Sequence, residues 1–105
     1  MMKSIITNSH NETVRVENST DNVTTSFSPD GMPLRQSEYT KSGEDIIIDF
    51  ANGKRVCSRT ISRDNKTVYK DAKGQDISKS EYNALLNMAK TANNLYYPER
   101  FIGER

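Results

Sequence analysis

The side chains that could take part in covalent or acid–base catalysis are few in this chain, and they lie far apart. Cys57 is the only cysteine and His10 the only histidine among 105 residues. A thiol becomes a nucleophile when a base stands beside it, and His10 lies in a distant polar stretch. We therefore expect Cys57 to be a small buried side chain. Because no cluster of Cys and His exists in the sequence, we expect no metal and no cofactor.

Two aspartates flank the most apolar segment of the chain. Asp45 and Asp49 enclose Ile46-Ile47-Ile48, and strand alternation places both on the same face as Ile47. Paired carboxylates can act as general acid and base, but acidic residues at strand spacing are typical of the solvated side of an antiparallel sheet. We interpret them as a solvated face. The sequence thus predicts a protein that is not an enzyme and has no catalytic residues.

Basic residues concentrate in the second half of the chain. Residues 51–75 carry seven basic and two acidic side chains, whereas residues 1–50 carry four basic and eight acidic ones, and the net charge is +1. The basic residues that we predict to contact a ligand are Arg55, Arg59, Arg63 and Lys70. Together with Lys66, Lys73 and Tyr69 they would suit nucleic acid, although a net charge of +1 gives little long-range attraction to a polyanion.

The C-terminal residues are rich in aromatic side chains. Tyr96, Tyr97, Arg100 and Phe101 follow one another closely, and these residue types dominate the energetics of protein–protein interfaces. We predict that they anchor a partner protein. The alternative is that Tyr96, Phe101 and Ile102 pack back onto the domain.

Closely spaced turn signals position these residues. Ser28–Gly31, Lys41–Gly43, Asn52-Gly53 and Asp71–Gly74 divide residues 23–77 into pieces of strand length. A weak repeat of aromatic residue, turn and aliphatic residue ends at Leu34, Val56 and Ile77, which is typical of successive hairpins that share one turn chemistry. The expected strands cover residues 34–40, 44–50, 54–62 and 66–71, with two shorter ones at 13–17 and 23–27.

A capping box starts a helix after the strands. Ser78 and Glu81 stand at the right spacing, and an apolar stripe of Tyr82, Leu85, Leu86 and Ala89 follows, so we expect a helix over residues 79–93 that packs on the sheet. The predicted fold class is α+β, an antiparallel β-meander of four to six strands followed by one C-terminal helix.

The register of two hairpins follows from their turns. A two-residue turn at Asn52-Gly53 pairs Phe50 with Arg55 and Ile46 with Arg59. A two-residue turn at Asp64-Asn65 pairs Arg59 with Lys70 and Arg63 with Lys66. Because like charges directly opposite each other are unfavourable, this register predicts that the four basic side chains are either exposed or offered to an anion.

Composition divides the chain into a polar, flexible arm over residues 1–22, a single domain over 23–95 and an aromatic tail over 96–105. The chain has neither a signal peptide nor an apolar run that could cross a membrane, so we expect a cytoplasmic protein and no membrane partner. Export by a route that needs no signal peptide is the alternative.

These observations favour a small, non-enzymatic protein-interaction module, of the adaptor, inhibitor or immunity type. We expect it to bind a partner protein through its sheet surface or its C-terminal tail. Two alternatives stay open: a nucleic-acid-binding protein that uses the basic strands of residues 54–73, and an effector exported by a specialised secretion system.

Overall fold

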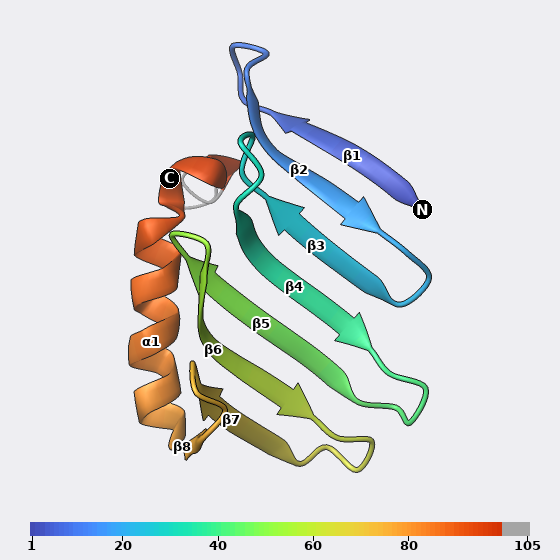
Figure 1. Ribbon diagram of the computed structural model, residues 1–105, viewed down its shortest axis with the longest axis vertical. Coiled ribbons are helices and arrows are strands. Elements are labelled where there is room, and N and C mark those ends of the chain that lie inside the picture. Colours follow the sequence, from blue (N-terminus) through green and yellow to red (C-terminus); the bar gives the residue numbers. More distant parts are fainter. Residues whose placement is uncertain (100–105) are drawn as a thin grey trace.

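A computed structural model describes residues 1–99, which form a single antiparallel sheet with a helix packed on one face (Figure 1). The order of the strands in the sheet is their order in the sequence, β1 to β8. The strands are β1 (Met2–Thr7), β2 (Thr13–Ser19), β3 (Val23–Phe27), β4 (Pro33–Tyr39), β5 (Asp45–Ala51), β6 (Lys54–Ile61), β7 (Thr67–Asp71) and β8 (Asp76–Ile77). The helix α1 (Lys79–Ala92) and the short 3₁₀ helix η1 (Asn94–Tyr96) follow.

Five of the connections between strands use the same turn chemistry. In each, the side chain of the first residue accepts a hydrogen bond from the backbone N–H four residues later. The fourth residue has a positive φ, which asparagine and glycine tolerate best. The first residues of these turns are Asn8, Ser28, Thr40, Ser62 and Asp71. Local side-chain bonds of this kind explain why the turn signals in the sequence mark the hairpins so reliably.

The class of fold is confirmed, but the expected count of four to six strands is too low. The sheet contains eight strands, because β1 and β8 were not expected. The two-residue β8 is too short to show a pattern, and β1 is recognisable only through its pairing with β2, in which Ile5 lies opposite Val16. Residues 1–22 thus contribute two strands to the sheet, and their flexibility stays a prediction.

The expected register is wrong for two pairs of strands. Phe50 does pair with Arg55, but a β-bulge next to it shifts the rest of the ladder, so that Arg59 lies opposite Ile47 instead of Ile46. The next turn spans Ser62 to Lys66 instead of two residues, and it pairs Arg59 with Tyr69. The expected pair of Arg59 with Lys70 therefore does not form. A bulge inserts one extra residue on one strand, and the sequence carries no clear signal of it.

The helix starts and packs as expected. The Ser78 side chain accepts a hydrogen bond from the Glu81 backbone N–H, and the Glu81 carboxylate accepts one from the Ser78 backbone N–H. Tyr82 and Ala89 are buried with Val56 and Cys57, and Leu85 and Leu86 pack against this cluster. The ring of Tyr82 lies 4.7 Å from that of Tyr69 on β7.

Two bulges direct aliphatic residues towards the helix. One lies between β3 and β4 at Leu34, and the other between β5 and β6 at Val56. Val56 and Cys57 are consecutive residues that both join the buried cluster, and Leu34 and Arg35 both line one cavity beneath α1. Leu34, Val56 and Ile77, the aliphatic positions of the weak repeat, all lie on the side of the helix.

The helix covers only part of one face of the sheet. It contacts β5, β6 and β7, while the opposite face, which we call the open face, has no element over it among the described residues (Figure 1). Residues directly opposite each other share a face, so the register assigns Ile48, Ser58 and Lys70 to the open face and Asp49, Cys57 and Asp71 to the covered one. No helix within residues 1–99 is long and apolar enough to cross a bilayer.

Replacing Ser78 by Ala should lower the free energy of unfolding by about 1 kcal/mol, because the Glu81 backbone N–H loses its acceptor at the start of α1. Urea unfolding followed by circular dichroism measures the change. Ser80→Ala is the matched control, since Ser80 lies exposed inside the first turn and makes no cap. Equal stabilities of the two variants would contradict the role of the cap.

Candidate functional site

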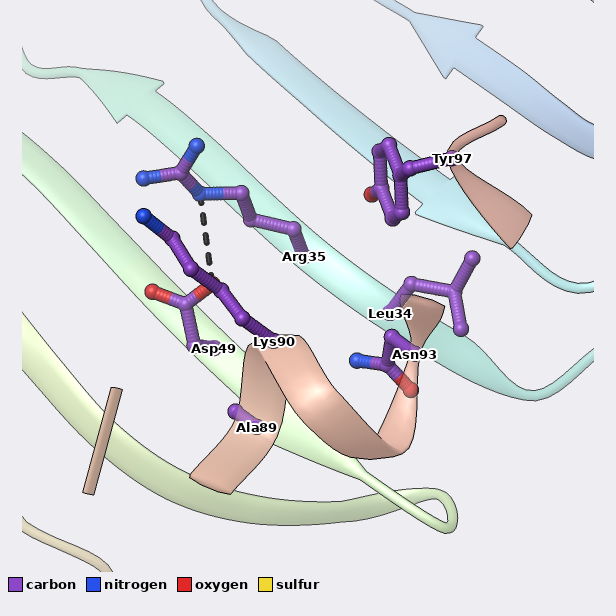
Figure 2. A pocket seen from close by; sticks show the side chains of 7 residues that line it. All are labelled: Leu34, Arg35, Asp49, Ala89, Lys90, Asn93 and Tyr97. Carbon is purple, nitrogen blue, oxygen red and sulfur yellow. Dashed lines mark ion pairs between the residues drawn. The ribbon is translucent and has the colours of Figure 1, made fainter. Parts of the chain in front are cut away.

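A buried carboxylate lies beneath the C-terminal half of α1. Asp49 on β5 is only 6% exposed, and its Oδ1 lies 3.3 Å from Nε of Arg35 on β4. Figure 2 shows this ion pair together with Lys90, Asn93 and Tyr97, which line the same small cavity. The interpretation of Asp49 as part of a solvated face is therefore wrong. The bulge at Val56 places Asp49 directly opposite Cys57, under the helix.

The charge of Asp49 affects two neighbouring acids. Burial, and then the negative charge of Asp49, raises the pKa of the Cys57 thiol to about 11, while Arg35 opposes the shift. The same two causes raise the pKa of the Tyr82 hydroxyl, with Arg59 and Arg35 among the opposing charges. Cys57 is a fully buried free thiol, which confirms the expectation of a small core residue. At neutral pH the thiol stays protonated, and the thiolate is the form that acts as a nucleophile.

The cavity beside Asp49 is too small for a substrate. Its volume of about 10 Å³ is close to the space for one water molecule. Among residues 1–99, no three His, Cys, Asp or Glu side chains gather in a way that could hold a metal ion. The arrangement around Asp49 therefore joins β4 and β5 beneath the helix, and it offers no room for chemistry on a ligand.

A second buried charge attaches the C-terminal segment to the sheet. The Arg15 side chain on β2 donates to the Tyr96 carbonyl oxygen at 3.0 Å, and its Nη1 lies 2.6 Å from Oε1 of Glu99. Its guanidinium carbon stacks 4.4 Å from the ring centre of Tyr97. Glu17 completes the set at 3.2 Å from Arg15 Nε. The contact with Tyr96 joins residues 81 positions apart in the sequence.

The open face contains a larger hollow at its N-terminal corner. This hollow of about 300 Å³ is formed by β1, β2, β3 and the turn after β3. Its walls are Lys3, Val16, Asn18, Phe27, Ser28, Pro29 and Gly31. The carboxamide oxygen of Asn18 is buried there without a hydrogen-bond partner. The hollow is thus lined by a cationic side chain, an aromatic ring and a free hydrogen-bond acceptor. A large side chain of a partner protein could bind in it.

The predicted basic residues do not form one patch. Arg59 faces the helix side, since it pairs with Tyr69, whereas Lys70 pairs with Ser58 on the open face. Lys70 Nζ also lies 3.9 Å from Oδ1 of Asp76. Arg55 is exposed near the N-terminal end of β6. Arg63 lies in the turn after β6, where its aliphatic carbons pack on Gly43, and a Cβ built on Gly43 would lie 3.2 Å from Arg63 Cγ.

The aromatic residues of the tail are only partly described. Tyr97 is buried beneath Arg15, and Tyr96 is half-buried in η1. Arg100 and Phe101 lie outside the described residues. A role for these four in partner binding stays a prediction, and for Tyr97 it would require the segment to detach from β2.

Sequence reasoning missed Asp49, Arg15 and the walls of the hollow. Asp49 and Arg15 depend on a bulge and on a contact between distant segments, and neither has a local sequence signal. The walls of the hollow had one: apolar and polar residues alternate in the expected strands at 13–17 and 23–27, and pairing of these strands brings Val16 opposite Phe27.

Replacing Asp49 by Ala should destabilise the protein by about 2 kcal/mol, because Arg35 loses its charge partner beneath the helix and is itself only partly solvated. The control is Asp45→Ala on the same strand and face, where we expect about 0.5 kcal/mol or less. Chemical unfolding of both variants measures the difference. Similar losses would show that the burial of Asp49 has no energetic consequence.

The raised pKa of Cys57 predicts a stability loss at high pH. The thiol ionises near pH 9 when unfolded and near pH 11 when folded, so its contribution is complete below pH 9 and is lost as the pH rises towards 11. Between pH 8 and pH 10 the wild type should lose about 1 kcal/mol more unfolding free energy than Cys57→Ala. Unfolding curves of both proteins at the two pH values test this, and equal losses would contradict it.

Comparison with models of protein families, with curated proteins and with solved structures finds no match. The case for a function therefore depends on the surfaces of this chain itself: the covered face with its buried charges, and the open face with its hollow.

Proposed function

We propose that this chain is a small, non-enzymatic protein-binding module that docks a partner protein on the open face of its sheet. The observation that carries the proposal is the coverage of the sheet: α1 lies on one face, and the opposite face is bare among residues 1–99. A sheet with one uncovered face is common when that face is polar. Here the open face mixes polar residues with large apolar ones.

Two groups of apolar side chains lie on the open face. One group belongs to β1, β2 and β3 and consists of Ile5, Val16 and Phe27, which are cross-strand neighbours. The other belongs to β5 and β7 and consists of Ile46, Ile48 and Val68. Thr25 and Gln36 lie between the groups. The open face thus carries two apolar patches separated by polar residues, and each patch with its polar neighbours has the mixed composition of a protein–protein interface.

The hollow gives this face a place for a central contact. Interface energy concentrates where a large side chain fills a desolvated pocket. The hollow beside Phe27 has the volume for such a side chain, and Lys3 at its rim would favour a partner with a carboxylate nearby. The hollow supports partner binding through the sheet. Binding through the tail is less favoured, because Tyr97 already stacks on Arg15.

The position of the basic residues disfavours the nucleic-acid alternative. Phosphate backbones are bound by basic side chains that line one continuous surface. Arg59 and Lys70 lie on opposite faces, and Arg55 and Arg63 lie at opposite ends of β6. The protonated, buried Cys57 likewise supports a function without thiol chemistry.

The proposal predicts that polar substitution of the open face abolishes partner capture. The triple variant Val16→Thr, Ile48→Thr and Val68→Thr keeps β-branched side chains in the strands while it removes apolar surface. Proteins captured from the native host by the wild type are identified by mass spectrometry, and their binding to each variant is then titrated. We expect affinity to fall about tenfold or more in the triple variant.

The matched control changes exposed apolar residues away from the open face. Met88→Gln and Leu95→Gln together alter α1 and the segment after it, where both side chains are exposed. This double variant should bind like the wild type. Equal binding by the triple variant would overturn the proposal. Retention on DNA or RNA at physiological salt that is lost in the triple change of Arg59, Arg63 and Lys70 to Ser would favour nucleic acid instead.

A further inference from the structure

The first strand of the sheet is an edge that no element covers among residues 1–99. The strand order makes β1 and β8 the two edges of the sheet. β8 has only two residues, and the chain then turns into α1. β1 has six residues with no proline and one charge, Lys3, and its irregularity lies at its end, between Ile6 and Thr7. Proteins usually protect long edges with charge, proline, bulges or a covering element.

Exposed apolar side chains also concentrate at this edge. Met1, Met2 and Ile5 are 92%, 72% and 59% exposed. They are three of the seven large apolar side chains that are exposed among the described residues. The edge therefore combines unpaired backbone groups with apolar side chains, which are the two features that favour the addition of another strand.

We propose that β1 pairs antiparallel with β1 of a second copy of this chain, around a two-fold axis through Ser4. A two-fold contact uses the same surface on both copies, so one interface covers both unprotected edges at once. Each copy then ends on its short β8 edge. A net charge of +1 gives the two copies little mutual repulsion. Pairing of five residues on each side would add on the order of six backbone hydrogen bonds.

The side chains of β1 are self-complementary in this register. In an antiparallel pair of strands, residues whose backbone N–H and C=O groups point towards the other strand lie opposite each other. When the two strands are identical, two paired positions are therefore both even-numbered or both odd-numbered. With Ser4 opposite Ser4, Met2 lies opposite Ile6 and Lys3 lies opposite Ile5. Apolar residues then meet one another, and each lysine stem lies on an isoleucine. An axis through Lys3 would instead place two lysines face to face.

The pairing joins the two sheets into one surface. Equal parity keeps the open faces of both copies on the same side of the sheet. Because Lys3 belongs to β1 and also forms a wall of the hollow, the two hollows flank the axis of the dimer. The dimer does not depend on the proposed function, and a failure of either leaves the other unaffected.

Opposite charges at one position test the interface and its register together. Ile5→Lys places a new lysine opposite Lys3 of the second copy, and dimerisation should weaken about tenfold or more. Ile5→Glu places a carboxylate opposite the same Lys3, so dimerisation should be kept or strengthened. Sedimentation equilibrium of the wild type and both variants over a range of concentrations measures the constants. Ile5 is largely exposed, so both variants should fold, and their thermal unfolding verifies this.

Two further variants serve as control and as structural check. Val68→Lys adds the same charge to another exposed position of the open face, far from β1, and should dimerise like the wild type. Ser4→Cys should form a disulfide-linked dimer on mild oxidation, since the two Cα atoms would lie about 4.5–5.5 Å apart, within the range that a disulfide spans. Ser58→Cys, in the middle of the sheet, should not.

Three results would overturn the proposal. The first is a wild-type protein that stays monomeric at every concentration, which would mean that β1 does not pair with β1 of a second copy. The second is a dimer that Ile5→Lys leaves unchanged. The third is equal weakening by Ile5→Lys and Ile5→Glu, because an axis through Ser4 requires the two charges to act in opposite directions.

Discussion

The contact between sheet and helix depends on two β-bulges, at Leu34 and Val56. In a regular strand every second side chain points away from the helix. Two consecutive residues of one strand could then not both contact α1. Each bulge turns an extra aliphatic residue to the covered face, next to Arg35 in one case and next to Cys57 in the other. In a core of so few buried residues, each of these contacts is a large share of the buried apolar surface. The position of the bulges also decides which side chains are buried and which stay on the open face.

Burial of charge follows from the same geometry. The bulge at Val56 places Asp49 opposite Cys57 and under the helix, where Arg35 balances its charge. A buried ion pair contributes little net stability, because desolvation offsets the attraction, but it penalises every arrangement that separates the two groups. Arg15 has the corresponding role for the C-terminal segment, through Tyr96, Tyr97 and Glu99. Asn93 at the end of α1 donates to the Phe50 carbonyl oxygen at 2.6 Å. Asn93 and Arg15 thus provide the polar contacts that fix the end of the helix and its extension on a sheet with few buried apolar side chains.

The local features of this fold are legible in the sequence, and the non-local ones are not. The turns were predicted because Asn, Ser, Asp and Gly make hydrogen bonds and backbone conformations within five residues, and the helix because Ser78 and Glu81 cap each other. The expected register of β5 with β6 is wrong because a bulge adds one residue without changing the composition. The expected register of β6 with β7 is wrong because the turn between them is longer than two residues. Part of the wall of the hollow could have been predicted, because alternation in two neighbouring strands brings Val16 and Phe27 opposite each other. The burial of Asp49 and Arg15 depends on the sum of many weak interactions over the whole chain.

The meander order has a consequence for how the chain acquires its structure. Each strand pairs only with its neighbour in the sequence, so the hairpins can form one after another as the polypeptide emerges from the ribosome. The helix that covers Leu34 and Val56 is made afterwards, and the residues that Arg15 holds come later still. The strands all precede α1 in the chain, so they can pair before the helix covers one face of the sheet. Packing of α1, and of the segment that Arg15 holds, then gives the sheet one covered face and one open face.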